Sequence, residues 1–197
     1  VYGRTPPCTN LILEQRIPRV VISCLDDSPE VNGRGIAILR AAGVEVTTGV
    51  LETRGRLLSR IRSTFVTQAR PYVILKYART PAGRFAPYPP RQFWITNDYS
   101  RRLVHKWRGE TDAVLVGPNT ALIDDPQLTN RLYFGPSPLR IVLDRRLRLP
   151  RELQLLNGSA PTLVVTESPS PPDQENLSYL QLSFLGEDFL PRLLHVL

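Results

Sequence analysis

Cys8 is the side chain near the N-terminus that is best suited to bind a metal ion. It follows Pro6 and Pro7, which hold the backbone rigid, and a helix beginning at this point would favour the metal-binding thiolate. Zinc deaminases of nucleobases use one His and two Cys ligands with a nearby Glu that moves protons. The sequence has no H-x-E motif and no partner Cys at a suitable spacing, so an unliganded thiol remains the alternative. Cys24 is expected to be a buried structural thiol.

Trp94 begins a second group, in which an aromatic ring precedes a basic helix. The ring could stack on a nicotinamide or a pyrimidine while an arginine of the helix holds a phosphate. The basic side chains of that helix are Arg101, Arg102, Lys106 and Arg108. An aromatic core residue beside a solvated basic face is the commoner arrangement and remains the alternative.

The segment Gly117–Pro126 (GPNTALIDDP) forms a third candidate. A short helix here would present free backbone N–H groups at the carboxyl edge of a sheet, where open α/β sheets bind ligands. An ordinary capped helix is the alternative. The chain contains neither G-x-G-x-x-G nor G-x-x-x-x-G-K-[ST], so neither common nucleotide-binding loop is supported. We expect His105 on a helix surface and His195 in the last helix.

Alternating strands and helices must position these residues. Apolar β-branched runs predict strands at residues 19–25, 44–50, 72–77, 112–117, 139–144 and 161–166. Helical spacing predicts helices at residues 34–42, 51–67 and 97–108. Gly43 is expected to end the first helix. The inward-facing residues of the two later helices are expected to be Leu57, Leu58, Ile61 and Phe65, and Leu103, Val104 and Trp107. Two α/β units with mostly parallel sheets, joined near residue 70, are predicted.

The composition limits the class of protein. The chain has 197 residues, of which 42% are hydrophobic and 22% charged, so it can bury a core. It lacks an apolar run long enough to cross a bilayer, which argues against a membrane protein. Two cysteines make no disulfide framework, so a cytoplasmic location is expected. The chain contains no methionine, which predicts an internal piece of a longer polypeptide.

The net charge of +7 is carried almost wholly by arginine. Residues 71–150 hold 13 basic and 6 acidic side chains, whereas residues 151–197 hold 2 and 6. Such a field suits nucleic acid or a phosphorylated small molecule, which arginine binds bidentately. Biased composition is a third explanation for the total charge but not for its clustering.

Together, in this order, the motifs resemble the bifunctional riboflavin-biosynthesis deaminase/reductase family. The resemblance rests on these segments: GRTPPCT at 3–9, NGRGIAILRAAGVEV at 32–46, RPYVILKYA at 70–78, FWITNDYSRRLVHKWR at 93–108, DAVLVGPNTALIDDPQLTNR at 112–131 and LRIVLDRRLRLP at 139–150. It extends to residue 166, and its last two blocks are specific for the reductase half.

The resemblance implies two α/β domains and two sequential reactions. Residues 1–69 would be the C-terminal half of a cytidine-deaminase-like zinc domain, which hydrolytically deaminates a diaminopyrimidinone ribosylamino 5′-phosphate. Residues 70–197 would be part of a dihydrofolate-reductase-like domain, which reduces the ribosyl group to ribityl with NADPH. The implied partners are the phosphorylated pyrimidine and further copies of the chain, in a homodimer or larger homo-oligomer, with no nucleic acid and no membrane.

The resemblance also assigns residues. Cys8 matches a zinc ligand. The positions matching NADPH contacts are Arg79, Trp94, Thr120, Asp124 and Arg145. The positions matching substrate contacts are Gln92, Arg108, Leu128 and Arg131, of which Arg108 and Arg131 are expected to bind the phosphate.

The chain departs from the family pattern in three places. The usual Ser-x-Asp-Gly turn reads Thr80-Pro81-Ala82-Gly83. The catalytic Glu and the other zinc ligands would precede Val1, so no catalytic residue is assigned within the chain. A late V-E-G-G segment would follow Leu197. We therefore expect no deamination and weak or no reduction by the chain itself. A reductase-only enzyme and, less favoured, an arginine-rich nucleic-acid-binding protein are the alternatives.

Overall fold

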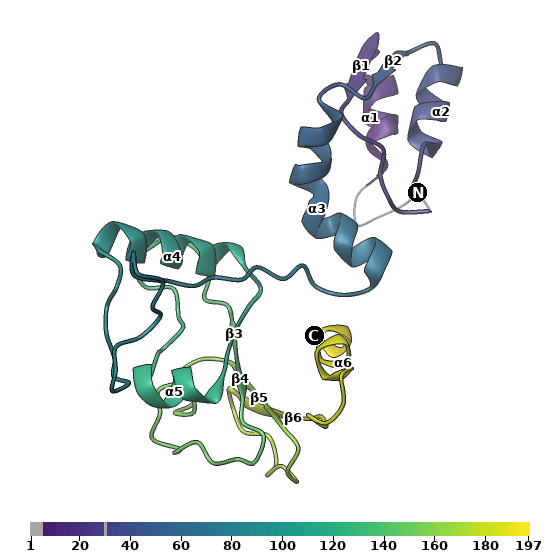
Figure 1. Cartoon of the computed structure of the whole chain (residues 1–197). Helices are drawn as coiled ribbons and strands as arrows, with labels where there is room; N and C mark the ends of the chain where they lie inside the picture. Colours follow the sequence, from purple (N-terminus) through teal and green to yellow (C-terminus); the bar gives the residue numbers. More distant parts are fainter. Residues whose placement is uncertain (1–5, 30) are drawn as a thin grey trace. The chain divides into compact units, whose positions relative to one another are not determined.

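The computed structural model describes residues 6–29 and 31–197, which form two compact units (Figure 1). The first unit is Val1–Ile74 together with Leu190–Leu197, and the second is Leu75–Phe189. Both contain parallel strands and helices, so the expected mixed α/β fold with parallel sheets is confirmed. The assignment of residues 1–69 and 70–197 to two particular domains stays a prediction.

The first unit is built around one β-α-β element. Strands β1 (Arg19–Ile22) and β2 (Glu45–Thr48) pair in parallel, with Arg19 opposite Glu45, and α2 (Arg34–Ala41) connects them. The unit also contains α1 (Cys8–Glu14) and α3 (Glu52–Gln68), and the last helix of the chain is α6 (Phe189–Val196).

Gly43 ends α2 as the sequence predicts. Its φ of +85° lies in the left-handed region that favours glycine. The N–H of Val44 donates to the carbonyl of Leu39 and the N–H of Gly43 to that of Arg40, each at 3.0 Å. This pair of bonds is the Schellman arrangement, which satisfies the last helical carbonyls.

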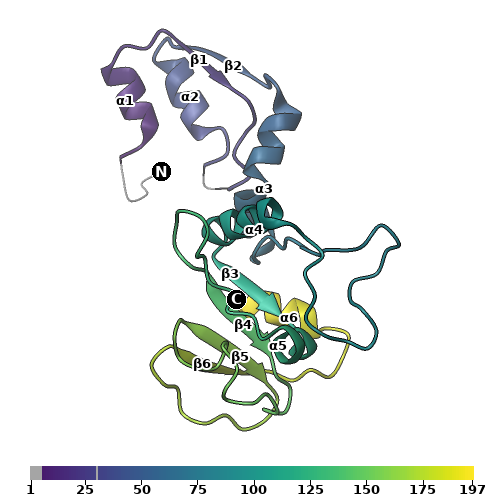
Figure 2. The ribbon, with the colours of Figure 1, turned by 90° about the vertical axis from the view of Figure 1, so that its left-hand side faces the viewer.

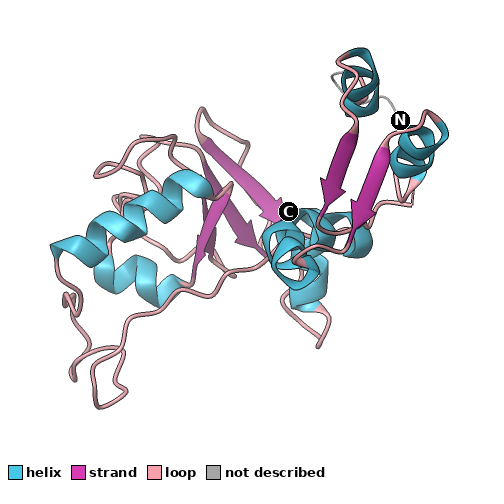
Figure 3. Cartoon of the chain, turned by 90° about the horizontal axis from the view of Figure 1, so that it is seen from above, coloured by secondary structure: helices cyan, strands magenta, loops and turns pink. Residues whose placement is uncertain are grey.

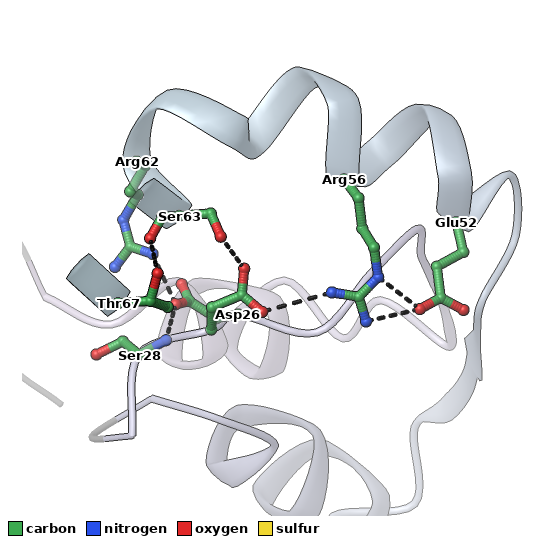
Figure 4. Close-up of polar contacts among 8 residues, drawn as sticks. Asp26, Ser28, Glu52, Arg56, Arg62, Ser63 and Thr67 are labelled. Carbon is green, nitrogen blue, oxygen red and sulfur yellow. Dashed lines mark hydrogen bonds and ion pairs between the residues drawn. The ribbon is translucent and has the colours of Figure 1, made fainter. Parts of the chain in front are cut away.

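Helix α3 is fixed by polar contacts rather than by an apolar face (Figure 4). Arg62 donates to Asp26 at 2.6 Å, and Arg56 and Ser63 donate to Asp27. The backbone N–H of Ser28 and the Arg62 guanidinium hold the pKa of Asp26 below its ordinary value. These contacts tie the segment after β1 to α3.

The expected inward face of α3 is wrong. Four of its apolar side chains are between 56% and 84% exposed: Leu57, Leu58, Ile61 and Phe65. No residue of α3 is buried. The apolar spacing placed these four side chains on one face of the helix, but the described residues do not bury that face.

The second unit is an open parallel sheet in the order β3-β4-β5-β6 (Figure 2). Its strands are β3 (Ala113–Val116), β4 (Leu139–Leu143), β5 (Thr162–Thr166) and β6 (Leu177–Gln181). Helices α4 (Asp98–Glu110) and α5 (Pro118–Asp124) lie beside this sheet (Figure 3). The Asn97 side chain caps α4 by accepting from the N–H of Ser100 at 3.0 Å, as a helix start requires.

The core of this unit lies around the middle strands. Side chains that are at most 2% exposed include Ala121, Val142, Leu155 and Val164. Arg140 of β4 is also fully buried and donates to the carbonyls of Gln154 at 2.8 Å and Ala160 at 2.6 Å. It thereby ties the loop between β4 and β5 to the sheet.

Four further expectations about the elements differ from the structure. Residues 72–77 are not a strand, because the described residues give them no ladder partner. Leu103 and Trp107 of α4 are each 44% exposed, whereas His105, expected on the surface, is only 6% exposed. Cys24 is half-buried and follows the end of β1. Strand β6 was not predicted.

Across residues 6–29 and 31–197, none of the helices combines the length and the apolar character needed to cross a membrane.

Candidate functional site

The carboxyl edge of the second sheet collects several of the predicted ligand-binding residues. Because β3, β4 and β5 are parallel, their carboxyl ends lie at the same edge. Helix α5 starts directly after β3, with Gly117 as its N-cap, and Thr120 lies exposed in its first turn. Arg145 follows β4. Two of the five predicted NADPH positions therefore lie at this edge.

An ion pair holds Arg145 at the edge. Its Nε donates to Oε2 of Glu167 at 2.6 Å, and the other carboxylate oxygen accepts from the backbone N–H of Phe184 at 2.5 Å. The hydrogen bond from Arg145 is the main reason that the pKa of Glu167 lies below its ordinary value. Glu167 thus links the ends of β4 and β5 to the segment after β6.

Gln92 and Asp124 are brought together by a hydrogen bond. The side-chain amide of Gln92 donates to the backbone carbonyl of Asp124 at 3.0 Å. The bond joins the loop before α4 to the last residue of α5. A predicted substrate position and a predicted NADPH position are therefore adjacent.

Trp94 presents an aromatic surface beside the start of α4. The side chain is 63% exposed, and the Arg101 guanidinium lies 4.7 Å from the centre of its ring. Asp98 pairs with Arg101 at 3.0 Å. A ring supported by a cation in this way is available for stacking, and the alternative of an aromatic core residue is excluded by its exposure.

Arg108 and Arg131 form a basic pair at the other end of α4. Arg108 donates to the carbonyl of Thr129 at 3.0 Å, and Arg131 donates to the Thr129 hydroxyl at 2.8 Å and to the Gln127 side chain. Burial, and then the neighbouring positive charge of Arg131, lower the pKa of Arg108.

This pair carries an uncompensated positive charge. In the part of the chain that the structure describes, neither guanidinium pairs with a carboxylate. Two adjacent guanidiniums repel each other, and a shared anion removes that repulsion while accepting charge-assisted hydrogen bonds. The geometry therefore favours a phosphate or carboxylate ligand.

The remaining predicted residues lie apart from these groups. Leu128 is 5% exposed and packs in the core, and its predicted contact with the substrate stays a prediction. Arg79 is exposed and lies two residues after the segment 72–77 that was expected to be a strand. Cys8 is exposed and is the first residue of α1. Within residues 6–29 and 31–197, no three His, Cys, Asp or Glu side chains are grouped to hold a metal ion.

A depression of about 260 Å³ lies at the opposite, amino edge of the sheet. Its lining residues are Leu139, Pro161, Thr162, Leu163, Asn176 and Ser178. None of them is charged, and none is a predicted site residue.

Two residues of the site were missed from the sequence. His105 lies one helical turn before Arg108 and contacts the backbone of Arg131, and the spacing i, i+3 was the available signal. Glu167 lies in a Ser/Pro/Glu-rich stretch, and its position beside Arg145 follows only from the pairing of β4 with β5.

The fold and these groups define a mixed α/β protein whose open parallel sheet positions polar side chains at its carboxyl edge. Residues 71–185 match the model of the RibD C-terminal domain family, which is more than half of the chain. The chain belongs to this family.

Individual relatives agree with this assignment. The "Riboflavin biosynthesis protein RibD" of Aquifex aeolicus is 45% identical over 170 residues, which is 84% of this chain and 47% of the relative. The protein of the same name from Synechocystis is 41% identical over 180 residues, or 91% of this chain and 48% of the relative. The chain spans about half the length of the curated relatives that it matches.

Solved structures are also similar over the whole chain. A Thermotoga maritima structure described as a diaminohydroxyphosphoribosylaminopyrimidine deaminase/5-amino-6-(5-phosphoribosylamino)uracil reductase has a TM-score of 0.86 and 38% identity. The similarity covers 100% of this chain and 55% of the Thermotoga maritima chain. Acinetobacter baumannii RibD, form 1, gives a TM-score of 0.81 and 32% identity with the same coverage.

Proposed function

We propose that the second unit carries the reductase site of a riboflavin-biosynthesis protein. It would bind NADPH and a pyrimidine that carries a ribosylamino 5′-phosphate, and reduce the ribosyl group to ribityl. The observation that carries the proposal is the pair Arg108 and Arg131, two adjacent guanidiniums without a carboxylate partner in the described chain. The pair lies in the region that matches the RibD C-terminal domain.

Residues of the second unit support a role in binding both ligands. Arg108 and Arg131 would hold the phosphate, and Gln92 would lie beside the substrate while its amide stays bonded to the carbonyl of Asp124. Trp94 offers a ring for stacking on the nicotinamide. Thr120 and Arg145 would contact the cofactor from the carboxyl edge of the sheet, and Arg79 would contact it from the segment before the Pro-rich loop.

The residues' contribution to the reaction is to position the ligands. NADPH supplies the hydride when it is bound. The arginine pair would fix one end of the substrate, and the Trp94 ring would stack against the nicotinamide. Holding two reactants in the correct orientation is a large share of the catalysis of such a transfer.

The zinc-dependent deamination is not supported in the same way. The similarity to the Thermotoga maritima structure extends over residues 1–69, which supports a deaminase-domain origin for that segment. The described residues do not fit a zinc ion, however, because Cys8 belongs to no group of three or more His, Cys, Asp or Glu side chains among them. The reductase site alone is what we propose for this chain.

Ribose 5-phosphate is the probe that tests the arginine pair, with isothermal titration calorimetry of the purified chain as the measurement. Each arginine replaced by alanine removes charge-assisted hydrogen bonds worth about 1.5–3 kcal/mol, so Arg108→Ala and Arg131→Ala should each weaken binding roughly 10- to 150-fold. Arg151→Ala, which removes an exposed arginine of the same unit, serves as the charge-matched control and should bind like wild type. Equal losses in all three variants would show a diffuse charge effect and reject the site.

A further inference from the structure

His105 is one of the few polar side chains that the fold buries, and it lies directly behind the arginine pair. The residue is 6% exposed in α4. Its Nδ1 accepts two backbone hydrogen bonds, from the N–H of Arg131 at 2.8 Å and from the N–H of Leu132 at 3.3 Å. A helix side chain therefore fixes the backbone of the segment that carries one of the two guanidiniums.

The surroundings of His105 disfavour a charged ring. From its own helix, Arg108 approaches Nε2 to 3.5 Å, and Arg101 adds a more distant positive charge. From the segment packed against it, Arg131 adds a third positive charge, and the Asn130 side chain interacts with the ring. Burial, and then the charges of Arg108 and Arg131, hold the pKa of His105 below its ordinary value, although Asn130 opposes this shift.

A neutral ring is also what the hydrogen bonds require. An imidazole nitrogen that accepts two N–H groups carries no proton itself, so the single proton of the ring lies on Nε2. Protonation of Nδ1 would break both bonds to Arg131 and Leu132. It would also place a third positive charge beside two guanidiniums.

We propose that His105 is a positioning residue for the anion site, in which its Nδ1 holds the backbone of Arg131 so that Arg131 and Arg108 face the same anion. Only the identity of that anion, a phosphate monoester, rests on the proposed function. The positioning role itself rests on the two hydrogen bonds and the burial. In this role His105 would touch neither the substrate nor the cofactor and would act through Arg131.

Two substitutions distinguish the effect of the acceptor atom from the effect of the volume of the ring. In His105→Asn the side-chain oxygen can take the place of Nδ1 as an acceptor. In His105→Leu a side chain of similar apolar volume has no acceptor. Arg151→Ala is the surface control. Each variant is made in the full chain.

The first readout is the hydrogen exchange of the Arg131 and Leu132 amides, measured by NMR without ligand. Loss of one to two hydrogen bonds at about 1 kcal/mol each should speed their exchange roughly 5- to 30-fold in His105→Leu. His105→Asn should stay within about threefold of wild type. Wild-type exchange in His105→Leu, or equal acceleration in both variants, would overturn the proposal.

The second readout is the affinity for ribose 5-phosphate compared with that for NADPH. His105→Leu should weaken ribose 5-phosphate binding by about tenfold and leave NADPH binding unchanged, because only the anion site depends on the Arg131 backbone. An equal loss of both ligands would indicate general loosening and reject the positioning role. If wild type does not bind ribose 5-phosphate, the proposed anion fails, and the amide exchange alone decides the role of His105. If His105→Leu does not fold, wild-type exchange and affinity in His105→Asn support the proposal, and accelerated exchange in that variant rejects it.

Discussion

Replacing Arg140 by methionine should destabilise the second unit by about 1–3 kcal/mol. The guanidinium makes two short hydrogen bonds, to the carbonyls of Gln154 at 2.8 Å and Ala160 at 2.6 Å, and a longer one to Gln127 at 3.4 Å. Arg140→Met removes the donor of the Gln154 carbonyl, whereas the Ala160 carbonyl keeps the hydrogen bond from the Thr162 hydroxyl at 3.0 Å. A buried carbonyl left unpaired costs about 1–3 kcal/mol.

The substitution also removes a buried charge, which by itself should stabilise the protein. Burial lowers the pKa of Arg140, and its Nε finds no hydrogen-bond partner among the described residues, so the charged form is itself costly to bury. Methionine removes that cost and fills most of the volume. Replacing buried ion pairs by apolar residues is often neutral for this reason, but here the partners are carbonyls, which remain in place.

Equilibrium unfolding in urea measures the difference. The two tryptophans, Trp94 and Trp107, both belong to the second unit, so their fluorescence reports on that unit alone. Arg151→Met, at an exposed position, should change the unfolding free energy by less than about 0.5 kcal/mol. An Arg140→Met protein that is as stable as wild type or more stable would refute the reasoning, because it would show that the carbonyls need no donor.

Three further predictions use the same unfolding assay. Leu128 is 5% exposed in the core and has a φ of +55°, so Leu128→Ala should cost about 3 kcal/mol. Leu128→Gly should cost no more than Leu128→Ala, because glycine regains about 1 kcal/mol in the left-handed region, and a clearly lower stability of the glycine variant would contradict this. Asn97→Ala should cost about 1 kcal/mol through loss of the α4 cap, whereas Asn97→Asp should retain it, and equal losses would show that the cap is not the cause. Because the pKa of His105 in the folded protein lies below its ordinary value of 6.5, the unfolded chain binds more protons below that pH. This contribution to stability is therefore present above pH 6.5 and is lost as the pH falls from 6.5 towards the folded pKa. His105→Asn should reduce the slope of the unfolding free energy against pH in this range. An unchanged slope would show that other groups cause the pH dependence.

Much of the fold could be predicted because its signals are local. The Asn97 cap, Gly43 after α2 and the β-branched runs of β4 and β5 each specify structure within a few residues. Residues 72–77 show the limit of this reasoning. Their apolar run is typical of a strand, but a strand also needs a neighbour, which is a property of the tertiary fold.

The residues of the candidate site could be predicted from the sequence, but the hydrogen bonds and ion pairs that hold them could not. The resemblance named Arg108, Arg131 and Arg145, whereas the partners that fix them became visible only in three dimensions. A buried histidine is apparent only when the segment after α5 returns to α4. The same segment contains Leu128, whose side chain packs in the core.

The most direct test of the account is a fluorescence titration of Trp107→Phe with NADPH. Trp94 is then the sole tryptophan of the chain, and it is the ring that we propose to lie against the nicotinamide. The account predicts saturable quenching of Trp94 that is weakened in Arg145→Ala but retained in Arg108→Ala. Absence of saturable quenching, or equal weakening in both arginine variants, would contradict the proposed reductase site.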